Sequence, residues 1–352
     1  MSLTMPLVWT DAHRLHRPGG EVWIGTPVPG DDVPERAERI RDALVAAGAP
    51  VVEATAHPED ALLAVHDERL VAFLRGAWAE WEAAGYPDDP GQDRVVAYIF
   101  PHPGLLGPLA PFEPAAASAR TGLYAFDTMT PVGAGTWEAV RGASDAALTA
   151  ADLVLGGAPA AYACCRPPGH HVTRSAYGGS CYLNNAAIAA QHLRDGGFER
   201  VAILDVDAHH GNGAQEIFRS RPDVRTGSVH VDPTAGWFPH FLGFAAESDN
   251  ANLNLPLAPG SGDEAWLAAV GELARFAQAD ALVVALGVDA AGGDPESPLN
   301  VTEAGFREAG RMLGSLRLPT VIVQEGGYDL TALGSLVLAA LEGVEEGMAG
   351  RA

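Results

Sequence analysis

The chain contains no lysine, so all the positive charge of its basic side chains comes from arginine. Its 22 basic residues stand against 45 acidic residues, and the formal net charge is −23. This excess argues against binding to nucleic acid or to an anionic membrane, because both would repel a negative protein. It is compatible with the attraction of small cations, although solubility alone would also account for it.

Cysteine and long apolar runs are also scarce. The three cysteines, Cys164, Cys165 and Cys181, are an odd number without the spacing of a disulfide framework, which fits a reducing compartment. No apolar run approaches the length of a membrane span, and residues 1–30 lack the charged-then-apolar pattern of a secretory signal. We therefore expect a cytoplasmic protein.

Short apolar runs alternate with helical patterns through the second half of the chain. The expected strands are 160–165, 201–204, 226–229, 281–286 and 320–323, and the expected helices are 182–193, 215–219, 264–277, 303–316 and 330–344. This alternation predicts an α/β fold with a mainly parallel sheet covered by helices. In such a sheet the ligand lies at the carboxyl ends of the strands.

Between about residues 85 and 135 the pattern stops, and proline and glycine become frequent. A long irregular segment inside a compact protein is usually functional or an interaction surface, with an ordinary surface elaboration as the alternative. Several aromatic side chains in it are expected to pack on other parts of the protein: Tyr98, Phe100, Phe112, Tyr124 and Phe126. We expect a single domain over residues 1–352 with this insertion embedded in it.

The run 201–204 ends directly in Asp205, Asp207 and His209. In an extended segment these three side chains point to the same side. Carboxylates and an imidazole aligned at the end of an apolar strand are costly to bury without a partner. A divalent metal is the simplest partner, because these ligand types suit zinc and related ions. A hydrogen-bonded Asp/His cluster that only closes the strand is the alternative.

Other expected strands also end in polar side chains, namely His170 with His171, Asp289, and Tyr328. Asp207, His209 and Asp289 would offer a metal two carboxylates and one imidazole. Three protein ligands leave one position open, as in a catalytic rather than a structural site. The tandem histidines would move protons, and Tyr328, on a Gly-Gly turn, would donate to an oxyanion. Together these groups describe metal-dependent hydrolysis of an amide or ester.

These residues also carry a family resemblance. The motifs are P-P-G-H-H (167–171), D-V-D-A-H-H-G-N-G (205–213), L-G-V-D with G-D-P (286–295) and E-G-G-Y (325–328). In this order they resemble the histone deacetylase and acetylpolyamine amidohydrolase superfamily. The resemblance implies an arginase/deacetylase-like fold and removal of an acyl group from an amine by zinc-activated water. Fe²⁺ would suit the same ligands in the cell.

By position, the resemblance makes Asp207, His209 and Asp289 the metal ligands. It makes His171 the general base and later acid, and Tyr328 the group that polarises the scissile carbonyl.

The resemblance also implies partners for the two histidines. Asp205 would pair with His170 and raise its pKa, whereas Asn212 would orient His171 without favouring its charged form. A structural potassium ion is implied close to the zinc, at Asp205, Asp207, His209 and Ser228.

Two further motifs, S-A-Y-G-G (175–179) and F-P-H-F-L-G (238–243), resemble the bacterial acetylpolyamine amidohydrolase branch, as does the insertion. The branch implies that the insertion builds a homodimer and narrows the entrance to the site. The substrate would then be a small cationic acetylated amine.

Substrate contacts follow from the same resemblance. Glu296 stands where polyamine-preferring relatives carry a gatekeeper glutamate that would pair with a distant ammonium, unless it is simply solvated. Phe238 or Trp237 would flank the aliphatic chain beside Gly179. Ser180 replaces an aromatic wall that relatives usually have.

Three alternatives remain. A broad-range or lysine-side-chain deacetylase would use the same chemistry with a wider entrance. A catalytically silent small-molecule binder would share the fold, but such a protein would be expected to have lost one of the site residues. A di-manganese ureohydrolase would need further bridging carboxylates, and Tyr328 would have no function in it.

Overall fold

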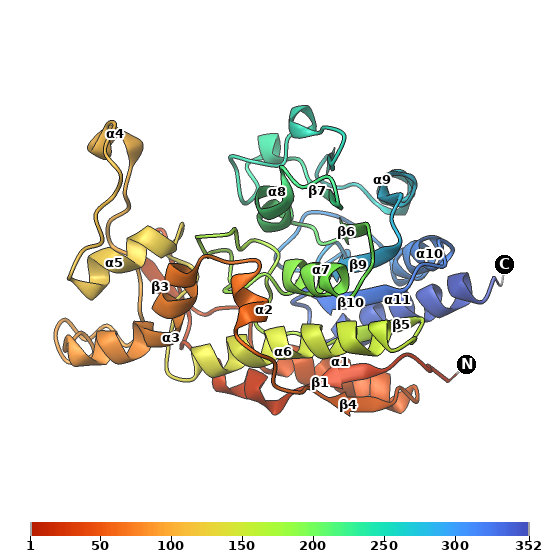
Figure 1. The fold of residues 1–352 in the computed structure, drawn as a ribbon, viewed down its shortest axis with the longest axis horizontal. Coiled ribbons are helices and arrows are strands. Elements are labelled where there is room, and N and C mark those ends of the chain that lie inside the picture. The colour runs from red at the N-terminus through yellow and green to blue at the C-terminus, as the bar shows by residue number, and fades with distance from the viewer. Residues whose placement is uncertain (1, 351–352) are drawn as a thin grey trace.

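A sheet of eight strands in the order β4-β1-β5-β10-β9-β6-β7-β8 forms the centre of the structure, a computed structural model that describes residues 2–350 (Figure 1). Every pairing in it is parallel. The strands are β1 Leu7–Trp9, β4 Val51–Glu53, β5 Ala160–Ala163, β6 Val201–Asp205, β7 Val224–Val231, β8 Asn252–Leu257, β9 Ala281–Leu286 and β10 Thr320–Gln324.

Helices cover both faces of this sheet, because successive strand residues point to opposite sides. Ile203 belongs to one buried cluster and its neighbour Leu204 to the other. The first cluster includes α3 Glu68–Ala83, α5 Ala117–Tyr124, α6 Thr136–Leu155, α7 Asn185–Asp195 and α8 Asn212–Phe218. The second includes α1 Glu35–Ala46, α9 Asp263–Ala277, α10 Glu303–Gly314 and α11 Leu333–Met348. The predicted fold class is thereby confirmed.

The insertion forms an arm that projects from the body, with the short helix α4 Pro103–Leu106 at its tip (Figure 1). We call residues 98–112 the arm. An isolated bridge between Val95 and Val132 closes its base. Tyr124 stacks on Phe73, with 4.6 Å between ring centroids, as expected for a packed aromatic. The expectation is wrong for three others, because Tyr98, Phe100 and Phe112 are exposed. Phe126 is 38% exposed but stacks on Phe238, with 6.3 Å between ring centroids.

Two strands of the sheet escape prediction from sequence. β4 has only three residues, too few for a period to show. In β8 the buried positions are the asparagines Asn252 and Asn254, whose side chains bond Gln215 rather than apolar neighbours. A hydrophobic pattern cannot reveal a strand that buries amides. The antiparallel hairpin of β2 Glu21–Trp23 and β3 Thr26–Val28 was missed as well.

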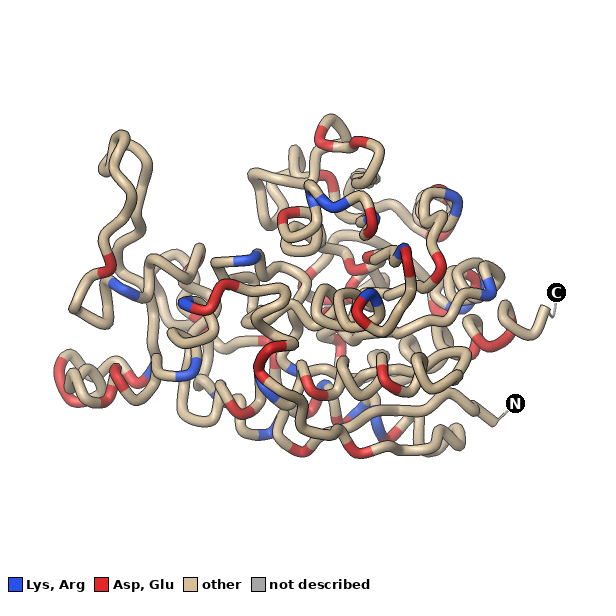
Figure 2. Tube along the Cα trace, viewed as in Figure 1, with Lys and Arg blue, Asp and Glu red and all other residues tan. Residues whose placement is uncertain are grey.

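Acidic residues are spread over the whole chain, with arginines scattered among them (Figure 2). Several arginines are paired with carboxylates, as in Arg141 with Asp145 and Arg200 with Asp280. Among the described residues, no helix is both long and apolar enough to cross a membrane. The remaining short helix, α2, spans Asp60–Leu63 and precedes His66. The ring of His66 accepts the Asn184 N–H at 2.9 Å, so this histidine holds backbone, as expected.

Candidate active site

The predicted metal ligands, the tandem histidines and Tyr328 lie on loops that follow β5, β6, β9 and β10, which are adjacent in the sheet. The carboxyl ends of these strands therefore meet at one edge, as expected for a parallel sheet. Of the other predicted residues, Asp205 and Ser228 lie within β6 and β7, Asn212 begins α8, and Trp237 and Phe238 follow β7. One detail of the expectation is wrong. β6 ends at Asp205, so Asp207 and His209 lie in the loop after it and do not share an extended strand with Asp205.

Asp207, His209 and Asp289 converge on one point, with ligand atoms all within 4.8 Å of one another. His209 Nδ1 lies 3.2 Å from Asp207 Oδ1 and 3.0 Å from Asp289 Oδ2. Both carboxylates are fully buried, which is costly for two negative charges so close together. A divalent cation would compensate both of them, and the donor set of two carboxylates and one imidazole suits zinc or iron.

Backbone from neighbouring loops fixes these carboxylates. The N–H of Gly326 donates to Asp207 Oδ2 at 2.8 Å, and the N–H of Ala208 donates to Asp289 Oδ1 at 2.8 Å. A Cβ at Gly287 or Gly326 would overlap the carboxylate of Asp207. Glycine is therefore required where these two loops approach the ligands.

The tandem histidines have the partners that were predicted for them. His170 Nδ1 lies 2.9 Å from Asp205 Oδ2, and His171 Nδ1 lies 2.7 Å from Asn212 Oδ1. Although burial lowers the pKa of His170, the carboxylates of Asp207 and Asp205 raise it to about 10. That ring is charged near neutral pH.

His171 differs from its neighbour in protonation. Burial, followed by the nearby rings of His170 and His209, holds the pKa of His171 well below its usual value. Asn212 also donates from its amide to the backbone carbonyl of His171 at 2.9 Å, which fixes this pairing. His171 is thus neutral near pH 7 and available as a base.

Arg36, on α1, holds the loop of Tyr328 and was not predicted. Its guanidinium carbon lies 4.4 Å from the centroid of the Tyr328 ring, and it donates to the carbonyls of Gly327 at 2.6 Å and Glu325 at 2.7 Å. Burial raises the pKa of Tyr328 well above its usual value. The phenol therefore keeps its proton and remains a hydrogen-bond donor.

Glu325 belongs to the E-G-G-Y motif and had no predicted role, and in the structure it contacts the backbone of the tandem histidines. Its Oε2 accepts the N–H groups of Gly169 at 2.7 Å and His170 at 3.1 Å. Burial raises its pKa to about 8. This side chain fixes the backbone that carries His170.

A cavity of about 450 Å³, which we call the active-site cavity, opens above these groups. His170, His171, His209 and Tyr328 line its floor and walls. All five predicted substrate residues line it too: Glu296, Phe238, Trp237, Gly179 and Ser180. Trp23 and Met129 are further lining residues, which sequence reasoning missed. The Phe238 ring meets His171 edge-on, with centroids 4.8 Å apart.

Gly179 and Ser180 both have positive φ, at 60° and 59°. A Cβ at Gly179 would overlap His171 and press on Phe238, so only glycine fits between these rings. The base of the insertion holds this turn, because Asp127 accepts the Gly179 N–H at 2.5 Å. Ser180 does not form a wall of the kind an aromatic would provide; its hydroxyl donates to Glu21 Oε1 at 3.3 Å.

Four carboxylates line the active-site cavity. Asp32 is paired with Arg36 and Arg166, and we call the other three, Glu21, Asp31 and Glu296, the acidic rim. Only Glu296 was predicted; the other two come from the hairpin and loop at residues 21–31, not from the insertion. Burial, then Glu296, raises the pKa of Glu21 to about 8. Burial, then Asp31, raises the pKa of Glu296. A cation close to Glu21 and Glu296 would stabilise their charged forms and lower both pKa values.

The predicted potassium residues are close together but already have partners. Asp205 and Ser228 face each other in the β6–β7 register. Ser228 Oγ lies 2.8 Å from His230 Nδ1, and Asp205 Oδ1 accepts the Asp207 N–H at 3.1 Å. The potassium site stays a prediction.

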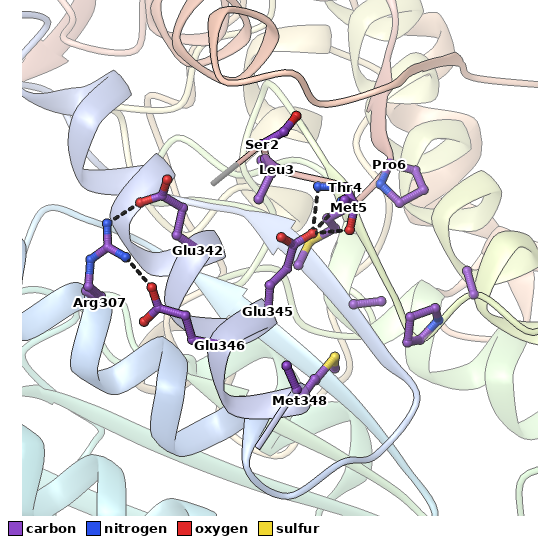
Figure 3. A pocket seen from close by; sticks show the side chains of 14 residues that line it. Ser2, Leu3, Thr4, Met5, Pro6, Arg307, Glu342, Glu345, Glu346 and Met348 are labelled. Atoms are coloured by element: carbon purple, nitrogen blue, oxygen red, sulfur yellow. Dashed lines mark hydrogen bonds and ion pairs between the residues drawn. The ribbon is translucent and has the colours of Figure 1, made fainter. Parts of the chain in front are cut away.

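A second cavity, of about 660 Å³, lies where the chain enters β1 and β5 (Figure 3). Its charged groups satisfy one another. Arg307 is paired with Glu342 and Glu346, and Glu345 accepts the Thr4 and Met5 N–H groups (Figure 3). This larger cavity therefore offers no free group for chemistry.

Known proteins resemble this chain along its length. A family model described as the histone deacetylase domain matches residues 31–344. The chain is 40% identical over 350 residues to acetylpolyamine amidohydrolase 1 of Pseudomonas aeruginosa, over 96% of this chain and 98% of that one. It is 44% identical over 328 residues to acetylpolyamine amidohydrolase of Burkholderia pseudomallei, over 91% and 92%. A crystal structure of acetylpolyamine aminohydrolase from B. pseudomallei matches with a TM-score of 0.90 and 40% identity, over 98% and 99%.

Proposed function

The chain belongs to the histone deacetylase family of metal-dependent deacetylases, and from this premise we propose that it hydrolyses acetylated polyamines to acetate and the free amine. The acidic rim is the observation that carries the choice of substrate. It places three carboxylates at one cavity whose floor holds the hydrolytic groups. The names of the similar bacterial proteins support the same choice.

Asp207, His209 and Asp289 would hold the metal, which we propose to be Zn²⁺, with Fe²⁺ as the alternative in the cell. When bound there, the metal supplies a Lewis acid that polarises the amide carbonyl and makes water more acidic. Gly326 and Ala208 hold the carboxylates in place through their N–H groups.

The protein's own residues would move the protons. His171, neutral and oriented by Asn212, takes a proton from the attacking water and returns it to the leaving nitrogen. His170 stays charged beside Asp205 and stabilises negative charge as it develops. Tyr328 donates its O–H to the oxygen of the former carbonyl. Phe238 and Trp237 flank the aliphatic chain, with Gly179 leaving room between Phe238 and His171.

The acidic rim predicts strong preference for a distant ammonium. Glu296→Gln should lower kcat/KM for acetylputrescine about tenfold, because a partly desolvated charge pair contributes on the order of 1.4 kcal/mol. N-butylacetamide, which has the same acetamide without the ammonium, should be unaffected. Steady-state kinetics with acetylputrescine, both acetylspermidine isomers, N-butylacetamide and an acetyl-lysine peptide measures this preference.

The pH dependence of KM for acetylputrescine tests whether Glu21 contacts the ammonium. Its raised pKa means that a binding cation displaces its proton below about pH 8. KM for acetylputrescine should therefore fall as the pH rises towards 8, and Glu21→Gln should remove this dependence. Glu272→Gln, at an exposed position of α9, is the matched control. If the peptide is hydrolysed as well as the amines and both variants behave as wild type, the protein is a broad-range or lysine deacetylase.

The arm supports the proposal of a homodimer. Leu105, Leu109 and Phe112 are 69%, 71% and 87% exposed. Exposure of apolar groups of this size to water is unfavourable, and their burial would stabilise the protein. A second copy of the chain would bury them, as the resemblance of the insertion implies. We therefore expect the mass in solution to be twice that of one chain.

Light scattering after size-exclusion chromatography measures that mass. The double variant Leu105→Glu with Phe112→Glu should elute as a monomer, because the charges oppose burial of the arm. Val45→Glu places the same charge on an exposed apolar residue of α1, away from the arm, and should leave the dimer intact. A wild-type monomer at micromolar concentration would contradict the proposal.

A further inference from the structure

The aspartate of the G-D-P motif, Asp294, has no role in the chemistry described so far. It is buried, and its two oxygens accept backbone N–H groups from its own loop and from the loop of Tyr328. Oδ2 accepts the N–H of Tyr328 at 2.7 Å and that of Asp329 at 3.2 Å. Oδ1 accepts the N–H of Glu296 at 3.0 Å. One carboxylate thus ties the loop of the tyrosine to the loop of the rim glutamate.

Both segments contribute a side chain to the active-site cavity. Tyr328 and Glu296 both line it, whereas Asp294 does not. Because a carboxylate is a rigid planar group, movement of the Glu296 backbone is transmitted to the backbone of Tyr328. Gly293, with φ of 96°, gives the segment the turn that brings Asp294 under both loops. Asp294 therefore acts on the substrate only through these two residues.

We propose that Asp294 is a positioning residue that couples recognition of the distant ammonium at Glu296 to polarisation of the carbonyl by Tyr328. This inference rests on the proposed function of both residues. An ammonium held by Glu296 steadies the loop, and Asp294 passes that restraint to the tyrosine. Binding energy at the remote end of the substrate is thereby expressed in kcat and not only in KM.

The tyrosine loop is sensitive to such a restraint because it is held on two sides. Arg36 packs on the ring and donates to the carbonyl of Gly327, while Asp294 accepts the N–H of Tyr328 itself. Releasing one side would let the phenol oxygen shift relative to the carbonyl. A misplacement of about 1 Å can lower a rate about 100-fold.

Two substitutions distinguish the contacts that the two oxygens of Asp294 make. In Asp294→Ala both contacts are lost, so kcat should fall roughly 10- to 100-fold for N-butylacetamide and by a larger factor for acetylputrescine. Asp294→Asn keeps one acceptor oxygen and turns an N–H₂ group to the other side. That oxygen should face the two N–H groups of Tyr328 and Asp329, so only the hydrogen bond to the Glu296 N–H is lost. The variant should then keep the wild-type kcat for N-butylacetamide, whereas its kcat for acetylputrescine should fall to the level of N-butylacetamide.

Double-mutant cycles test whether Asp294 acts through these residues. In a Tyr328→Phe background, Asp294→Ala should change kcat by no more than about twofold, because its effect on the tyrosine is already absent. In a Glu296→Gln background, Asp294→Asn should have no further effect on the ratio of kcat between the two substrates. Melting temperature and bound metal are measured for every variant. Asp263→Asn is the matched control, because Asp263 also clamps a distant backbone N–H, that of Thr302, at 2.7 Å but lies outside the cavity.

The outcomes separate the inference from the proposed function. If effects in both cycles are simply additive, or if kcat falls only as far as melting temperature and metal content fall, Asp294 is merely structural and the inference is overturned. If wild type shows no preference for acetylated amines, the proposed substrate fails instead. The cycle with Tyr328→Phe, run on whichever acetyl amide is hydrolysed, then still decides whether Asp294 positions the tyrosine.

Discussion

Removal of the metal by a chelator should reduce hydrolysis of acetylputrescine by about 10³-fold or more, because the Lewis acid contributes several kcal/mol to the transition state. Activity should return on addition of one equivalent of Zn²⁺ or Fe²⁺ per chain. The melting temperature should fall on chelation, because Asp207 and Asp289 are both fully buried and lose their compensating charge. Activity, metal content and thermal unfolding of the same sample measure the three effects.

A ligand variant makes the prediction specific to these residues. Asp289→Asn removes one charged ligand and should lower both metal content and activity, whereas Asp263→Asn, outside the cavity, should leave both unchanged. Full activity in a preparation shown to be free of metal would contradict the assignment. Retention of metal by Asp289→Asn with wild-type affinity would instead place the ion elsewhere.

Loss of His171 should have the second large effect. His171→Ala should lower kcat about 10²- to 10⁴-fold, the usual contribution of a positioned general base. KM should change little, because the ring shapes only part of the cavity. Steady-state kinetics at saturating acetylputrescine measures the loss.

Replacement of Asn212, the partner of His171, should shift the pH dependence of the activity. A base must be unprotonated, and burial holds the pKa of His171 well below its usual value, so wild-type activity should persist to low pH. Asn212→Asp puts a carboxylate where Oδ1 now lies 2.7 Å from Nδ1, and this raises the pKa. The acid limb of the kcat profile, which does not contain the effect of Glu21 on KM, should then move to higher pH. An acid limb that stays in place in Asn212→Asp would argue against His171 as the base.

The chemistry of the floor of the site was accessible from sequence because each group directly follows an apolar strand. Asp207, His209, Asp289 and Tyr328 all lie after strands that alternate with helices, and the rule for parallel sheets brings them together. The structure places them as expected, and their chemical roles remain predictions. What was wrong was the extended conformation expected from Asp205 to His209, because β6 ends at Asp205.

The residues that hold the site residues in place could not be predicted from the sequence in the same way. Arg36 and Glu21 come from the first 40 residues, yet they contact the loop of Tyr328 and Ser180 respectively, 291 and 159 positions away. No periodicity signals a contact over such a separation. The buried amides of β8 and the exposed aromatics of the arm were also missed, because both run against the rule that apolar side chains are buried.

The β2–β3 hairpin, which carries Glu21, pairs only with itself and is not a strand of the central sheet. Its turn residues Ile24 and Gly25 carry no contact that the eight strands depend on, and Ile24 is largely exposed. Glu21 and Asp31 of the acidic rim thus lie on a piece of the chain separate from the strand ends, whereas Glu296 lies in the same loop after β9 as Asp289. If the acidic rim selects the amine, replacement of residues 21–31 would change that selection through Glu21 and Asp31 and leave the residues at the strand ends in place.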